Sequence, residues 1–109
     1  MPFVPAQNAL PHAPFPGVEG RVVHGTQMTL AFWDLPAGAE VPEHAHVHEQ
    51  ILHVVHGLVE VTLGTESQRV VADGSVVIPS EVPHGVRVVE DARVIDVFHP
   101  ARPEYGRRG

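Results

Sequence analysis

Histidine is the residue type most able to carry chemistry in this chain. The sequence has nine histidines, and five of them fall between His44 and His56. Side chains two residues apart in a strand point to the same face, so His44 and His46 are predicted to project together, about 6–7 Å apart. Neutral imidazole is the commonest metal ligand, and such a pair needs only one or two further donors. The spacing predicts a metal site; the competing interpretation is surface or core histidines that hold no ion.

Further donors can be sought by the same parity and by position in the chain. Gln50 and His48 keep the parity of the pair, while Glu49 and His53 point the other way. His84 is the best distant donor, because it opens a predicted strand after two prolines, a position that would aim its side chain into the mouth of a barrel.

A second group of candidate residues lies near the end of the chain. Asp96 and Phe98 share one face of a predicted strand, and Pro100 turns the chain so that Arg102 can reach back. The planar guanidinium of arginine can bind a carboxylate through two hydrogen bonds. The alternative interpretations are a simple Asp96–Arg102 salt bridge and core packing of Phe98.

The elements that would position these residues are predicted to be short strands. Twenty residues are valine, whose stiff side chain favours the pleated sheet. Apolar runs are separated by turn residues every 8–12 positions, and no window shows the helical period over three turns. This pattern predicts an all-β antiparallel sandwich or small barrel. The predicted strands cover residues 21–23, 28–35, 50–55, 58–63, 68–72, 75–78, 86–89 and 93–98, with breaks that include Gly57 and Glu90-Asp91.

Composition excludes several classes of protein. A hydrophobic fraction of 43%, a charged fraction of 18% and a mean hydropathy of +0.01 argue against a disordered acidic chain and against a membrane-spanning one. The absence of cysteine excludes disulfides and thiol nucleophiles. Thirteen acidic residues against seven arginines give a net charge of -6 without a basic stripe, so no nucleic-acid partner is expected.

The length of 109 residues suits one domain. Residues 1–16 are predicted to form a proline-rich extended arm, residues 17–105 a single barrel domain, and residues 106–109 a frayed tail. The first residues show no targeting signal, so a cytoplasmic location is expected.

Two motifs resemble those of the cupin superfamily. Residues 38–50 followed by Gly57 are similar to the first cupin motif, and residues 73–84 to the second. The sequence departs from the usual pattern in having Gln50 at a position usually occupied by Glu, Asp73-Gly74 in reversed order, and Val88 where Asn is expected.

The resemblance implies a cupin-type antiparallel β-barrel, also called a double-stranded β-helix or jelly roll, that forms a homodimer. It implies one divalent transition metal, which could be nickel, zinc, manganese, iron or copper. With a neutral amide in place of Glu, the ion would keep its +2 charge, attract an anionic small-molecule substrate and polarise a carbonyl or hydroxyl strongly. The implied ligands are His44, His46, Gln50 and His84.

The chain's ending resembles a narrower group. Residues 94–105 and the run 48–51 are similar to KdgF-type cupins, which convert 4,5-unsaturated monouronates from pectin or alginate to the linear keto form. This likeness implies catalytic roles for Asp96, as the proton-transfer group, and Arg102, which would bind the substrate carboxylate. Phe98 would pack against the sugar. Pro103 and Glu104 depart from that group's usual ending.

Three functional classes stay open on the sequence. The first is a metal-dependent enzyme without redox chemistry, acting on an unsaturated sugar acid or a related enolisable carbonyl compound; polyketide cyclases of the same superfamily share the three-His, one-Gln set. The second is an Fe(II)-dependent dioxygenase. The third is a non-catalytic barrel that binds a small ligand, in which Asp96 and Arg102 would be structural.

Overall fold

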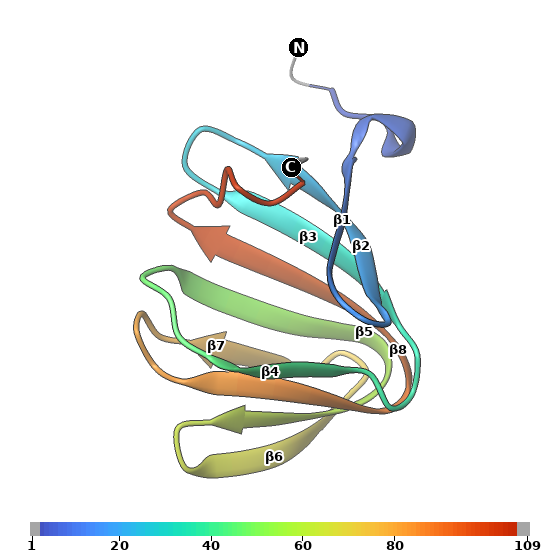
Figure 1. Ribbon diagram of the computed structural model, residues 1–109, viewed down its shortest axis with the longest axis vertical. Coiled ribbons are helices and arrows are strands. Elements are labelled where there is room, and N and C mark those ends of the chain that lie inside the picture. Colours follow the sequence, from blue (N-terminus) through green and yellow to red (C-terminus); the bar gives the residue numbers. More distant parts are fainter. Residues whose placement is uncertain (1–2, 107–109) are drawn as a thin grey trace.

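The computed structural model describes residues 3–106, which form antiparallel strands joined by loops (Figure 1). The all-β antiparallel fold predicted from the sequence is confirmed. The single helical element among the described residues is one 3-10 turn, so this part of the chain has no helix long and apolar enough to cross a membrane. The elements are η1 (Ala6–Asn8), β1 (Leu10–Phe15), β2 (Val18–His24), β3 (Thr29–Leu35), β4 (Glu40–His44), β5 (Glu49–Leu63), β6 (Glu66–Val71), β7 (Ser75–Ile78) and β8 (His84–His99).

The strands form two facing sets, which are the two halves of the barrel, and the long strands β5 and β8 run through both of them. They pair with each other along almost their whole length, with register shifts between Val54 and Val59. The first half of β5 and the second half of β8 join β7, β3, β2 and β1, whereas their other halves join β6 and β4. Figure 1 shows both strands curving at the right, so that the two sets of strands face each other.

The curvature of these strands corrects the sequence-based prediction, which broke the chain at Gly57 and at Glu90-Asp91. Gly57 lies inside β5 with φ of +93°, and a Cβ there would collide with the backbone of Asp91 and Ala92. Glycine therefore lets β5 bend tightly against β8 without ending it. The predicted strands 50–55 and 58–63 are one continuous strand, β5, and the predicted strands 86–89 and 93–98 are likewise one strand, β8.

The core lies between the facing halves and follows the period of two expected for strands. In β3, Ala31, Trp33 and Leu35 are buried, while Phe32 and Asp34 between them are exposed. The largest fully buried apolar side chains come from four other strands: Val22, Leu52, Val54, Val59, Ile78 and Val94.

Two further elements were not among the strands predicted from the sequence. Within the predicted arm, residues 10–15 form β1 and pair with β2, so this segment lies on the barrel. Strand β4, which contains Pro42, pairs with β8. Residues 107–109 of the predicted tail lie outside the described residues, as do residues 1 and 2.

Candidate metal centre

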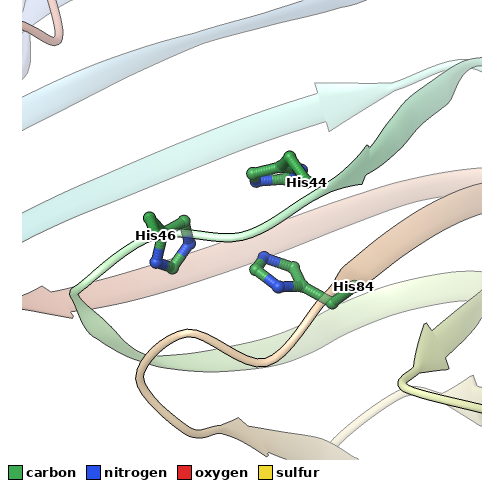
Figure 2. A group of neighbouring side chains, drawn as sticks. All are labelled: His44, His46 and His84. Carbon is green, nitrogen blue, oxygen red and sulfur yellow. The ribbon is translucent and has the colours of Figure 1, made fainter.

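Three of the four predicted metal ligands come together at one end of the barrel. His44 is the last residue of β4 and His84 the first of β8, and the two are cross-strand partners. His46 reaches the same place from the loop between β4 and β5. Their potential donor atoms all lie within 4.8 Å of one another, and Figure 2 shows the rings facing a common space. The prediction that His44 and His46 share a strand was wrong, because β4 ends at His44.

A hydrogen bond to the backbone fixes the tautomer of each of these imidazoles. In each ring Nδ1–H donates to a backbone carbonyl, which leaves the Nε2 lone pair available in the neutral form. Burial lowers the pKa of His46 and of His84 and so favours that form. Nε2 of His84 is buried and has no hydrogen-bond partner in the described part of the chain. The acceptors are Pro42 for His44 at 2.9 Å, His48 for His46 at 3.0 Å, and Val82 for His84 at 2.9 Å.

The side-chain oxygen of Gln50 is a fourth potential metal ligand beside His46. Its Oε1 lies 3.1 Å from Nε2 of His46, and with Nδ1 of that ring protonated, both atoms are acceptors. Two ligands bound to one ion at about 2.1 Å lie roughly 3–3.4 Å apart, and the separation of these two atoms fits that geometry. Three imidazoles and an amide oxygen therefore fit a divalent transition metal.

Asp96 lies directly behind Gln50. The Gln50 side-chain amide donates to Oδ1 of Asp96 at 2.8 Å, and the indole N–H of Trp33 donates to Oδ2 at 2.9 Å. The carboxyl is only 8% exposed, and this burial raises its pKa to about 6 despite both hydrogen bonds and the positive charge of Arg102. A buried acid held at both oxygens has a defined orientation for proton transfer.

Arg102 lines the same cavity as Asp96, without a salt bridge between the two among the described residues. Its guanidinium carbon lies 5.0 Å from the centre of the Phe98 ring and 4.2 Å from that of Tyr105. Nε donates to the exposed Glu104 carboxylate at 3.3 Å, whereas Nη1 is buried without a hydrogen-bond partner. This arrangement leaves a fixed cationic donor for an anionic ligand.

One cavity of about 270 Å³ joins these groups. Asp96, Phe98 and Arg102 line it together with three of the four candidate ligands, while His46 lies beside it. The β1–β2 hairpin closes one side. The other lining residues are Pro14, Phe15, Val18, Trp33, Val41, Leu52, Val86 and Tyr105.

Comparison with known proteins identifies the family. A family model described as "Cupin domain" matches residues 31–98. The chain belongs to the cupin family. The cupin-type fold predicted from the sequence is thereby confirmed.

Several relatives of this cupin are known. An uncharacterized protein of Streptomyces coelicolor is 31% identical over 74 residues, which make up 67% of this chain and 70% of that protein. The structure of KdgF from Halomonas sp. matches with a TM-score of 0.86 and 29% identity, covering 95% of this chain and 97% of that one. An RmlC-like cupin from Shewanella frigidimarina matches with a TM-score of 0.87 and 25% identity, covering 95% of each chain. The predicted likeness to KdgF-type cupins is confirmed.

A more distant likeness concerns the fold alone. Salicylate 1,2-dioxygenase from Pseudaminobacter salicylatoxidans matches this cupin with a TM-score of 0.76 at 18% identity, over 82% of this chain and 28% of that chain.

Sequence reasoning missed two residues of the site. Trp33 is buried in the core, and its N–H also orients Asp96. A buried tryptophan needs a hydrogen-bond acceptor, and the inward parity it shares with Ala31 was the available signal. Tyr105 packs on Arg102 from the loop beyond β8, where no strand period applies.

The remaining histidines do not join the metal ligands. His48 packs near His46 and Phe98, with ring centroids 5.3 and 6.3 Å away. His53 faces away from the cavity, as predicted, and bonds to Ser75.

Proposed function

We propose that this cupin is a metal-dependent enzyme without redox chemistry that opens the ring of a small 4,5-unsaturated sugar acid to its linear keto form. The observation that supports this most is the convergence on one cavity of a metal-ligand set, a buried carboxyl and a partly unpaired arginine. The substrate class is taken from the resemblance of residues 94–105 and 48–51 to KdgF-type cupins, and the structural match to KdgF supports that resemblance.

The reaction is an isomerisation, so it needs no oxidant, reductant or second substrate. The hydroxyl at the hemiacetal carbon loses its proton, the bond from that carbon to the ring oxygen breaks, and an aldehyde forms. The enolate left at the other end of the opened ring gains a proton on carbon and becomes a ketone. One carboxyl can accept the first proton and return a proton in the second step.

The residues around the cavity suit these steps. Arg102 would pair with the substrate carboxylate, and Phe98 would pack against the ring. Asp96 would transfer the proton, with its orientation set by Gln50 and Trp33. The three histidines and Gln50 would hold one divalent ion, which could be nickel, zinc, manganese, iron or copper. When bound, such an ion supplies Lewis-acid polarisation of a substrate oxygen.

The decisive experiment follows the ultraviolet absorbance of a 4,5-unsaturated monouronate with metal-loaded protein, with chelated protein and with chelated protein reloaded with each metal. The proposal expects loss of the double-bond signal faster than in buffer, abolished by chelator and restored by reloading. Bound metal without any such acceleration would overturn the uronate assignment.

Two alternatives are separated by further measurements. An Fe(II)-dependent dioxygenase would consume oxygen, whereas the proposed isomerisation would not. A non-catalytic ligand-binding barrel would show no turnover, so a substitution of Asp96 would have no activity to lower. We expect Asp96→Asn to lower the rate by about 10²–10⁴-fold while metal content stays unchanged, since the amide keeps the shape but cannot transfer a proton.

A further inference from the structure

The loop that carries Arg102 and Tyr105 is tied to the barrel by two residues outside the cavity. Thr29, the first residue of β3, is fully buried and accepts the backbone N–H of Arg102 at 2.8 Å. His24, the last residue of β2, contacts the Thr29 hydroxyl through Nδ1 at 2.8 Å and the backbone carbonyl of Tyr105 through Nε2 at 3.0 Å. Neither Thr29 nor His24 lines the cavity.

With a neutral His24 ring, the partners determine the direction of every hydrogen bond in this group. A carbonyl oxygen only accepts, so Nε2 of His24 must carry the proton that bonds to Tyr105. In the neutral ring Nδ1 then accepts, and the Thr29 hydroxyl donates to it while accepting the N–H of Arg102. The backbone N–H of Tyr105 in turn donates to the carbonyl of Arg102 at 3.0 Å. Both ends of the 102–105 turn are thus held by one His–Thr pair.

This tether matters because the position of the guanidinium depends on both backbones. The guanidinium of Arg102 packs over the ring of Tyr105, and its Nη1 has no hydrogen-bond partner among residues 3–106. Figure 1 shows the β2–β3 hairpin beside the loop that follows β8, which is how an element far away in sequence reaches this turn. An anion-binding arginine is effective only if it is held in place before the ligand arrives.

We propose that His24 and Thr29 are positioning residues for Arg102 and thereby set how well this cupin binds the carboxylate of its substrate. The proposal rests on the proposed function for its substrate, but its structural part can be tested without any turnover.

The first test uses nuclear magnetic resonance on the metal-loaded protein. We expect the nitrogen shifts of His24 to show the Nε2–H tautomer, and the amide of Arg102 to be protected from hydrogen exchange. Thr29→Val should speed that exchange about ten-fold or more by removing the acceptor, whereas Thr29→Ser, which keeps the hydroxyl, should restore protection. An Nδ1–H tautomer, or equal exchange in the two variants, would overturn the tether.

The second test uses a double-mutant cycle in the uronate assay. Thr29→Val should raise KM about ten-fold with a smaller change in kcat, and Thr29→Ser should stay close to the parent protein. In an Arg102→Ala background, Thr29→Val should have little further effect, since the group it positions is gone. Equal losses with and without Arg102 would show a merely structural role and overturn the proposal. If the parent protein has no uronate activity, the proposed function fails, while the exchange and tautomer results still decide the tether.

Discussion

Gln50 connects the candidate metal ligands to the candidate proton-transfer group. Its Oε1 lies beside Nε2 of His46, and its side-chain N–H₂ donates to Asp96. A glutamate, which the first cupin motif usually has here, could not make the second contact, because an ionised carboxylate only accepts hydrogen bonds. The amide therefore lets one side chain serve an ion and a buried acid together.

Restoring the usual glutamate tests this arrangement. We expect Gln50→Glu to keep metal binding, since carboxylate is also a ligand, but to lower uronate turnover about ten-fold or more. The donor to Asp96 would be replaced by an acceptor, and two like charges would lie side by side. Metal content by elemental analysis and turnover by absorbance are the measurements. Unchanged turnover would show that the Gln50–Asp96 contact has no catalytic role.

His84 is the most buried of the three candidate histidine ligands, so its loss should affect metal binding strongly. We expect His84→Ala to lower metal affinity at least ten-fold by removing one ligand. His53→Ala is the matched control, because His53 bonds to Ser75 outside the cavity. Elemental analysis after dialysis against a known free metal concentration measures the difference. Equal metal content in the two variants would argue against a site at His84.

The shape of the two long strands determines where these side chains lie. β5 carries Gln50 near its start, and β8 carries His84 at its start and Asp96 near its end. Because β8 bends, His84 pairs with β4 while Asp96 pairs with β3, yet both face one cavity. The bend is therefore what brings ligand and acid together.

Gly57 allows that bend, so replacing it should be costly. Gly57→Ala forces an L residue into the left-handed region and pushes a Cβ into the backbone of β8, so we expect the free energy of unfolding to fall by more than about 1–2 kcal/mol. Gly64→Ala is the control, because Gly64 also has positive φ but has open space around it. Urea unfolding compares the two. Equal losses would show that the close approach to β8 is unimportant.

For the whole molecule, metal binding and stability are expected to be coupled. The candidate ligands come from β4, the β4–β5 loop, β5 and β8, which meet only in the folded chain. A ligand that binds only the folded state stabilises it by about 2.7 kcal/mol at one hundred times Kd.

Chelation should therefore lower the melting temperature. We expect a fall of about 5 °C or more on metal removal, reversed by reloading, and a smaller fall in His84→Ala. Differential scanning calorimetry at fixed protein concentration is the measurement. A parent protein whose melting temperature changes with neither chelator nor added metal would contradict the metal site.

The homodimer expected from the sequence stays a prediction, which a measurement of the molecular mass in solution would test.

Much of this protein follows from its sequence alone. Short, valine-rich apolar runs separated by turn residues predicted the strands. The period of two within a strand placed Asp96 and Phe98 on one face, and both are buried. The motifs singled out His44, His46, Gln50 and His84, and the structure brings these side chains to one end of the barrel.

Other features were decided only by the tertiary structure. A glycine can end a strand or bend it, and only the close pairing of β5 with β8 shows that Gly57 bends it. His46 lies in a loop, where no period holds, and reaches the site because the chain reverses between β4 and β5. Trp33 meets Asp96, and His24 meets Tyr105, across 63 and 81 residues of sequence. Local patterns can show that a side chain faces inward, but only the packing of distant strands and loops determines which polar groups meet.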